Sequence, residues 1–320
     1  MRRFFKCFTR RLKFQNRYTL AASKEITKEA ANPDLEENMN LSVIIPVSAD
    51  FRLLKCIQSI DEDVEIVVVF NNNPSKRLII ESRLDPRVKV VTIDEAGCNL
   101  ASVFNVGISN VSHNQVLLTN SDCVFYPGQV RACEDALKTA PVAKGSILFE
   151  SNSFATELVA KLRFLFHEVF SERKNLYGPG LAFHRSIVNQ IGGYYFDEDI
   201  GWGEDGELSK RIYASGLDVV YLEQTMLRHP PESIRHDLRI AYKIGYGEWI
   251  QHCKSGTTLP KAIVADVLNL FLDRSHRFRT VLAREGILLF GYLLVWKLTA
   301  HLGYYIRAIK EKGGCRDYKE

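Results

Sequence analysis

The sequence lacks the cysteine spacing of a disulfide framework or a zinc site. Its 320 residues include seven cysteines, an odd number, and they are scattered along the chain without a CxxC pair. Disulfide frameworks and structural zinc sites both need paired or clustered cysteines. We therefore expect reduced thiols and a cytosolic setting.

Long apolar runs are also missing. The longest, residues 287–296, is interrupted by Lys297 before it is long enough to span a bilayer. The first residues alternate Arg and Lys with Phe and lead into no apolar core, so we expect no signal peptide. No segment is therefore expected to cross a membrane.

Charged residues are present in ordinary numbers but are unevenly distributed. With 46% hydrophobic and 25% charged residues and a net charge of +4, the composition is that of a globular protein. Residues 1–24 carry no acid, and residues 274–312 again combine Arg and Lys with aromatic and apolar residues. This mixture is typical of helices that lie on an anionic membrane surface. For the C-terminal end, a helical hairpin packed on the rest of the chain or on a partner is the alternative.

Between the two ends, β-branched runs alternate with helical patterns. The runs predict strands at 41–47, 64–70, 88–93 and 115–119, with helices at 51–60 and 100–110 among the segments between and after them. This alternation implies an α/β domain with a doubly wound, mostly parallel sheet, in which ligands bind beyond the carboxyl ends of the strands. We divide the chain into a basic arm and linker (1–40), the α/β domain (41–255) and an amphipathic helical region (256–320).

Three polar residues, Asn120–Asp122, follow the fourth predicted strand at this ligand-binding edge. A turn is the ordinary interpretation, because Asn, Ser and Asp bond readily to nearby backbone. A carboxylate between small neighbours is also what a divalent cation and its phosphate ligand need. The residues alone leave both interpretations open.

Several segments, in a fixed order, carry a resemblance to a known family. The segments SVIIP, EIVVV, EAGCNLASVFNVG, LLTNSD, GPGLAFHRS and GGYYFDEDIGWGEDGEL resemble family 2 glycosyltransferases with the GT-A fold over residues 41–230. The resemblance implies a Rossmann-like domain that transfers a single sugar, with inversion, from a nucleotide-sugar donor to a glycan or lipid-linked acceptor in polysaccharide biosynthesis. It gives no role to nucleic acid. A processive synthase is disfavoured, because QxxRW is missing.

The resemblance also implies a metal site. It places the NSD segment at the family's DxD motif, with Asn120 in the first acidic position and Asp122 as the direct ligand. The cation would be Mg²⁺ or Mn²⁺, which balances the charge that grows on a diphosphate leaving group. His229 follows a later strand pattern, and a histidine near this position completes the metal site in some relatives. A purely structural role is the alternative for His229.

The same resemblance places a general base in the segment GWGEDGEL, at Asp205 beside Glu204. An acceptor hydroxyl attacks poorly until a base removes its proton. Helix capping is the alternative role, because acids are favourable at the start of a helix. Trp202 would form a wall against the acceptor sugar, unless it only packs, and Gly180 would face the donor sugar and the acceptor.

We expect the donor site at the ends of the first, second and fourth strands. The residues assigned to it are Pro46, Asn71, Asn105, Asn120 and Ser121. Two departures weaken any assignment of the nucleotide. Phe70 stands where many relatives have an Asp that reads uracil, and Phe104 replaces the Arg of their ARNxG motif. The nucleotide base is therefore left open.

Two alternatives to a glycosyltransferase remain. A sugar-nucleotidyltransferase needs a Gly-rich, Arg-containing loop after the first strand, where this chain has PVSADFRLL. A non-catalytic binding subunit would explain Phe70 and Phe104, whereas the intact carboxylates oppose it. We expect a peripheral membrane enzyme on the cytosolic face.

Overall fold

The computed structural model describes residues 39–311, except residues 49, 72–73, 82, 94–97, 170–174, 257–258, 262–263, 265–280 and 284. The chain's contacts divide it into two units after Asn38, and the described residues lie in the second. The predicted basic arm and part of the predicted C-terminal helical region lie outside the described residues.

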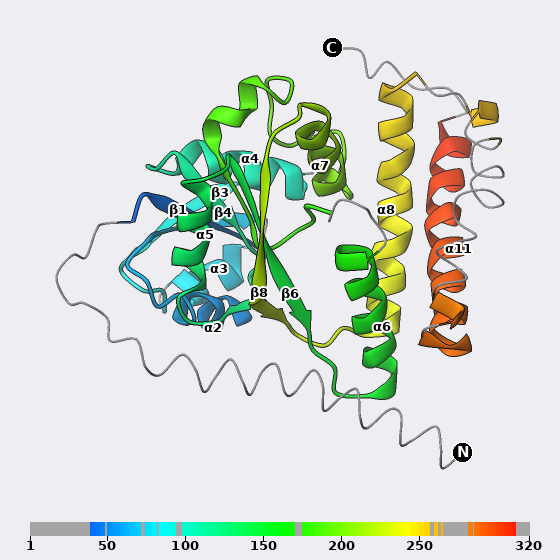
Figure 1. Cartoon of the computed structure of the whole chain (residues 1–320), viewed down its shortest axis with the longest axis horizontal. Coiled ribbons are helices and arrows are strands. Elements are labelled where there is room, and N and C mark those ends of the chain that lie inside the picture. The colour runs from blue at the N-terminus through cyan, green and yellow to red at the C-terminus, as the bar shows by residue number, and fades with distance from the viewer. Residues whose placement is uncertain are drawn as a thin grey trace. The chain divides into compact units, whose positions relative to one another are not determined.

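One mixed sheet organises the described part of the chain (Figure 1). Its eight strands are β1 (Leu41–Val47), β2 (Glu65–Asn71), β3 (Val88–Ile93), β4 (Gln115–Leu118), β5 (Val124–Phe125), β6 (Val142–Phe149), β7 (Leu181–His184) and β8 (Val219–His229). They are ordered β3-β2-β1-β4-β7-β6-β8-β5. The first four strands pair in parallel, and β6 pairs in parallel with β8. The predicted mostly parallel α/β sheet is confirmed, and the sequence patterns did not predict that β7 runs antiparallel to both its neighbours.

Helices cover both faces of the sheet. They are α2 (Arg52–Gln58), α3 (Pro74–Glu81), α4 (Leu100–Asn110), α5 (Gln129–Leu137), α6 (Phe154–Phe164), α7 (Glu204–Ala214), α8 (Ile234–Lys254) and α11 (Ile287–Lys310), with a π-helical turn, η1 (Leu165–Val169), after α6 and a 3₁₀ turn, η2 (Arg185–Asn189), after β7. Successive strand residues point to opposite faces, so Val43 and Ile45 pack with α2 and α5. Ile44 packs with α4 and α7 on the other face. Two cores therefore enclose the sheet.

A third core joins α6, α8 and α11, which lie side by side in Figure 1. Two glycines allow α8 and α11 to approach closely. A Cβ on Gly245 of α8 would lie 1.8 Å from the carbonyl oxygen of Ala300, and a Cβ on Gly303 of α11 would lie 2.0 Å from that of Tyr242. Any larger residue at either position would push the helices apart.

Helix α11 corrects one prediction. By length and composition it is able to cross a membrane, with a mean hydropathy of 1.3 over its most apolar stretch. Only the judgement that this segment is too short was wrong, because a spanning helix needs about 20 predominantly apolar residues rather than an unbroken run, and Lys297 alone does not disqualify it. About 39% of that stretch is buried in the protein. Length and composition do not distinguish a membrane span from a packed helix.

The cysteines also depart from expectation. Cys56, Cys98, Cys123 and Cys133 are free, as predicted. Cys253, on α8, is disulfide-bonded, so the prediction that every thiol is reduced is wrong for it. Scattered spacing argues against a framework of clustered disulfides, but it does not exclude a single bond.

Candidate active site

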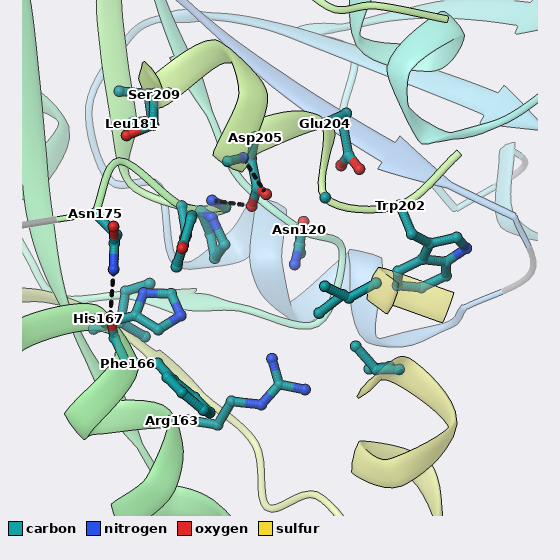
Figure 2. A pocket seen from close by; sticks show the side chains of 18 of the residues that line it. Asn120, Arg163, Phe166, His167, Asn175, Leu181, Trp202, Glu204, Asp205 and Ser209 are labelled. Carbon is teal, nitrogen blue, oxygen red and sulfur yellow. Dashed lines mark hydrogen bonds between the residues drawn. The ribbon is translucent and has the colours of Figure 1, made fainter. Parts of the chain in front are cut away.

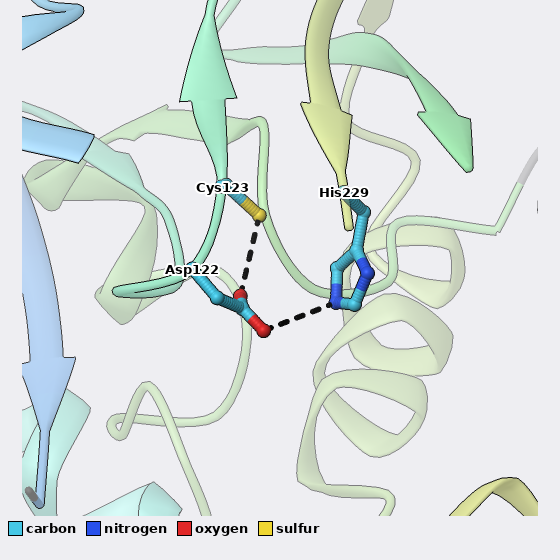
Figure 3. Close-up of side chains that lie close together, drawn as sticks. All are labelled: Asp122, Cys123 and His229. Atoms are coloured by element: carbon cyan, nitrogen blue, oxygen red, sulfur yellow. Dashed lines mark hydrogen bonds and ion pairs between the residues drawn. The ribbon is translucent and has the colours of Figure 1, made fainter. Parts of the chain in front are cut away.

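The NSD segment forms a turn at the carboxyl end of β4. The backbone N–H of Cys123 donates to the carbonyl of Asn120 at 3.1 Å. The side chain of Asn120 lines a cavity. The carboxylate of Asp122 reaches toward the end of β8 (Figure 3). The turn interpretation and the ligand interpretation are therefore compatible, because the backbone makes the turn and the carboxylate stays available.

Strand pairing brings the predicted metal ligands together. The short strand β5 follows the turn and pairs antiparallel with the end of β8, in register Val124 to Arg228. His229 therefore lies beside the turn, with its Nε2 atom 3.6 Å from Oδ2 of Asp122. Ligand atoms of Asp122, Cys123 and His229 all lie within 4.8 Å of one another (Figure 3).

The donor atoms of this cluster fit a hard divalent cation. Nδ1 of His229 lies 2.9 Å from the carbonyl of Pro230, which assigns the proton to Nδ1 and leaves the lone pair on Nε2 facing Asp122. Burial raises the pKa of the Cys123 thiol well above its usual range, which disfavours the thiolate form that binds metals. One carboxylate and one imidazole leave further positions for water and phosphate oxygens.

The second carboxylate pair opens α7. Glu204 and Asp205 are its first two residues, which confirms that they stand at a helix start. Asp205 accepts hydrogen bonds from the N–H groups of Gly178 at 2.8 Å and Gly206 at 2.7 Å (Figure 2). Glu204 is only 4% exposed, and its Oε2 atom is buried without a hydrogen-bond partner.

Burial raises the pKa of both carboxyl groups, but their hydrogen bonds differ. Burial, and then the charge of Asp205, raises the pKa of Glu204 to about 8. Burial also raises the pKa of Asp205, but the N–H donors of Gly178 and Gly206 oppose this rise because they stabilise the anion. The two N–H donors therefore favour the ionised form at Asp205, and no such donor reaches Oε2 of Glu204 among the described residues.

A cavity of about 780 Å³ joins the second pair to the end of β4. Among the described residues, five buried polar atoms of its lining residues make no hydrogen bond: Oε2 of Glu204, Nδ1 of His167, Nε1 of Trp296, and Oε2 of Glu232 and Nη2 of Arg163, which are in ion pairs. Buried polar groups are nearly always bonded, so such atoms indicate a place for polar groups of a ligand. The lining includes Asn120, Phe149, Arg163, Phe166, His167, Tyr177, Trp202, Glu204, Asp205, His229 and Trp296 (Figure 2).

Of the other predicted site residues, some line the cavity and some do not. Trp202 lines the cavity, with the Nζ atom of Lys243 4.4 Å from its ring centre. Gly180 lies beside the cavity, where its N–H donates to the carbonyl of Leu118 at 2.8 Å. Ser121 belongs to the NSD turn but does not line the cavity.

The three remaining donor-site predictions lie away from the cavity lining. Pro46 is buried within β1. Asn71 ends β2, where its Nδ2 donates to the carbonyl of Cys98 at 3.3 Å and its Oδ1 is buried and unbonded. The amide of Asn105 bonds with the backbone of Phe196 and the carboxylate of Glu198.

Sequence reasoning missed several cavity residues. Arg163 of α6 donates through Nε to Asp237 at 2.7 Å, and Asp237 also accepts from the hydroxyl of Tyr292. His167 lies in the π-helical turn after α6, and Trp296 comes from α11. Trp296 lies in the predicted C-terminal helical region, 256–320, and no motif marks Arg163 or His167. Their meeting in one cavity depends on tertiary packing.

Comparison with known proteins places the chain. A family model described as glycosyl transferase family 2 matches residues 42–192. No curated protein matches the sequence. The mannosyltransferase PcManGT from Pyrobaculum calidifontis, solved with GDP-Man and Mn²⁺, is 15% identical, and the match covers 92% of this chain and 94% of that chain with a TM-score of 0.55.

Two structures of TarS from S. aureus are more distant in shape. TarS 1-349 is 15% identical, and the match covers 88% of this chain and 93% of that chain with a TM-score of 0.48. A longer TarS chain is 14% identical with a TM-score of 0.45, and the match covers 75% of this chain and only 42% of that chain. At these identities the similarity to PcManGT shows the fold alone, whereas the family model and the ordered motifs speak for the enzyme class. Residues 42–192 therefore match the family 2 glycosyltransferase model, and the described residues have the GT-A fold of PcManGT.

Proposed function

We propose that the enzyme transfers a single sugar, with inversion and with a divalent cation, from a nucleotide-sugar to a glycan or lipid-linked acceptor. One observation carries the proposal. His229 and the carboxylate pair, Glu204 and Asp205, line one cavity at the carboxyl end of β4, and Asp122 lies behind His229, with its Oδ2 atom 3.6 Å from Nε2. This arrangement provides both a charge-balancing end and a proton-accepting end for group transfer.

The charge-balancing end would hold Mg²⁺ or Mn²⁺ on the carboxylate of Asp122 and on Nε2 of His229. When bound, the cation supplies positive charge to the diphosphate leaving group. The small neighbours Asn120 and Ser121 leave room for the pyrophosphate. We assign Asn71 to the nucleotide base, because its buried and unbonded Oδ1 is free to accept a hydrogen bond.

The proton-accepting end is Asp205. Its carboxylate takes the proton of the acceptor hydroxyl while that oxygen forms a bond to the anomeric carbon of the donor sugar. The bond from this carbon to the diphosphate breaks at the same time on the opposite face, and the nucleoside diphosphate leaves. Trp202 supplies an apolar wall for the acceptor sugar, and Gly180 leaves space where a side chain would intrude. The N–H donors of Gly178 and Gly206 favour the ionised form of Asp205, which a base needs.

The alternatives have less support. A sugar-nucleotidyltransferase would need a cationic, Gly-rich loop after β1, and the sequence there is PVSADFRLL. A non-catalytic binding subunit has no need of a buried pair of carboxylates, which is costly to desolvate. We retain three regions, residues 1–40, 41–255 and 256–320, as the proposed functional division.

We also propose peripheral attachment to the cytosolic face of an anionic membrane, through the basic arm and through α11. Leu298 and Leu302 are 68% and 55% exposed on α11, and this helix contains no acid. Flotation of the full chain with phosphatidylglycerol-rich vesicles tests this. Deletion of residues 1–20 and Leu298→Glu should each reduce binding several-fold, whereas Phe154→Glu, at a 62% exposed position on α6, should not. A full chain that stays soluble at low salt with excess lipid contradicts the attachment.

The test of the catalytic proposal is a hydrolysis and transfer panel. The full chain is incubated with nucleotide-sugars, including UDP-GlcNAc and GDP-Man, with and without Mn²⁺, and release of nucleoside diphosphate is measured. Cleavage of at least one donor, dependent on Mn²⁺, is expected. Binding of a nucleotide-sugar without any turnover would instead favour the non-catalytic subunit.

A further inference from the structure

Lys144 is a buried lysine in the middle of the sheet. It lies on β6 and is only 4% exposed. Lysine is almost never fully buried unless it is paired. Here the two hydrogen bonds of Nζ go to backbone carbonyls, at 2.8 Å to Pro179 and at 3.0 Å to Gly145. The ammonium group has therefore lost its water, and one of its two hydrogen bonds is made to the loop that contains Pro179.

That loop, Gly178–Gly180, has an unusual backbone. Gly178 and Gly180 have φ angles of +51° and +83°, in the left-handed region that favours glycine. On one side the N–H of Gly180 donates to Leu118 of β4, and on the other the N–H of Gly145 donates to the carbonyl of Gly180, each at 2.8 Å. The loop is thus fixed between two strands at its Gly180 end.

The other end of the loop faces the proposed base. The N–H of Gly178 donates to Oδ2 of Asp205 at 2.8 Å. Between this N–H and the fixed Gly180 lies Pro179, which has no N–H to donate and is held through its carbonyl by Lys144. A continuous chain of contacts therefore runs from Lys144 through Pro179 and Gly178 to the carboxylate.

We propose that Lys144 is a positioning residue, which holds the Pro179 carbonyl and thereby aims the Gly178 N–H at the carboxylate of Asp205. Lys144 does not line the cavity, so it does not touch donor or acceptor. Its effect on the reaction passes through the loop. This inference rests on the proposed role of Asp205 only for its catalytic consequence.

The charges around Lys144 agree with this role. Burial lowers its pKa to about 8, and the nearby carboxylates of Glu168 and Asp205 oppose the decrease. The positive charge of Lys144 in turn opposes the rise that burial causes in the pKa of Asp205. The other titratable groups that interact with Lys144 are the thiols of Cys123 and Cys133 and the imidazole of His167.

Hydrogen exchange tests the clamp without any donor or acceptor. Lys144→Met keeps most of the side-chain bulk and removes the ammonium. In the full chain, the amides of Gly178 and Gly180 should exchange about tenfold faster or more, because they open with the loop. Val142→Ala is the control, since it removes buried carbon from the same strand without touching the loop. Unchanged exchange in residues 176–182 of Lys144→Met would overturn the proposal.

Kinetics test the catalytic consequence, with the donor that the hydrolysis panel identifies. Lys144→Met should lower kcat about 10- to 100-fold, with the donor KM within about twofold of wild type, because a misdirected base costs rate rather than binding. Lys144→Arg, which keeps charge and donors, should recover part of the loss. Val142→Ala should leave kcat unchanged at a temperature where it is folded. Faster exchange with unchanged kcat would refute the positioning role while leaving the clamp intact, and failure of every donor would refute the proposed function alone.

Discussion

Two carboxylate regions of this molecule contrast sharply. The Asp122 carboxylate, 15% exposed, lies at a strand end between two basic groups, with the Arg52 guanidinium at 3.4 Å and the His229 imidazole at 3.6 Å. The Glu204–Asp205 pair lies at a helix start, where Asp205 accepts hydrogen bonds from the backbone N–H groups of Gly178 and Gly206. The first region balances a carboxylate with the guanidinium of Arg52, and the second balances it with backbone dipoles. Environment, rather than residue type, separates a cation ligand from a proton acceptor.

The strongest test of this contrast is Asp205→Asn. The amide is nearly isosteric but cannot accept the acceptor's proton, so turnover should fall by about two to four orders of magnitude. Mn²⁺-dependent nucleotide binding should be unchanged, because the strand-end region is untouched. Steady-state kinetics together with calorimetry measure both. Near-normal turnover would transfer the role of base to Glu204.

The reciprocal variant is Asp122→Ala. Loss of the proposed carboxylate ligand should lower Mn²⁺ affinity by about 100-fold or more, since removal of outer partners alone costs about 10- to 100-fold. Metal-dependent nucleotide binding should be lost with it. Calorimetric titration with Mn²⁺ and nucleoside diphosphate gives the comparison. If the affinity for the nucleoside diphosphate is the same with and without Mn²⁺, in the wild type and in the variant, Asp122 is not the metal ligand.

The sequence anticipated these two regions to different degrees. The bounds of β1, β3 and α4 agree with prediction, because β-branched runs and helical spacing are local signals. The carboxylates of Asp122 and Asp205 can also be read from the local sequence, and the order of the motifs along the chain assigned each one its expected role through the family resemblance. Their environments are not local, since Arg163, His167 and Trp296 reach the cavity from distant helices.

Other misses have the same physical origin. The burial that raises the pKa of Glu204 depends on packing around α7, which no motif encodes. Asn105 fits a donor-binding motif, yet its amide is occupied by bonds to Phe196 and Glu198, far along the chain. Lys144 carries no motif, and only the register of β6 beside β7 brings it to the Gly178–Gly180 loop.

The pH dependence of stability distinguishes the helix-start pair from the strand-end site. Burial raises the pKa of Glu204 from 4.5 to about 8, so between these values the folded chain holds a proton that the unfolded chain has lost. The free energy of unfolding should therefore decrease as pH rises through this window, by up to about 1.4 kcal/mol per pH unit. Glu204→Gln cannot titrate and should flatten the slope. Urea unfolding at pH 5.5, 6.5 and 7.5 measures it, and equal slopes for both proteins would contradict the assignment.

The smallest expected effect concerns the guanidinium of Arg52, which lies beside Asp122. Arg52 is 56% exposed in its side chain and is held mainly by Asp50, whose carboxylate lies 2.6 Å from Nη2. Its Nη1 atom lies 3.4 Å from Asp122, so a bound cation and this guanidinium repel each other. At about 4 Å two unit charges interact by about 1 kcal/mol in water, which is about fivefold in affinity. Arg52→Gln should therefore raise Mn²⁺ affinity about two- to fivefold in the absence of nucleotide.

A matched control separates this contact from the general charge of α2. Lys55 lies on the same helix, one turn further along, and its side chain is exposed. Lys55→Gln makes the same change in net charge and should leave Mn²⁺ affinity within error of wild type. Stability should also change little in either variant, because exposed ion pairs contribute about 0 to 1 kcal/mol. Equal gains in both variants would mean that net charge alone sets the affinity, and weaker binding in Arg52→Gln would show that the guanidinium supports the strand-end site instead of competing with its cation.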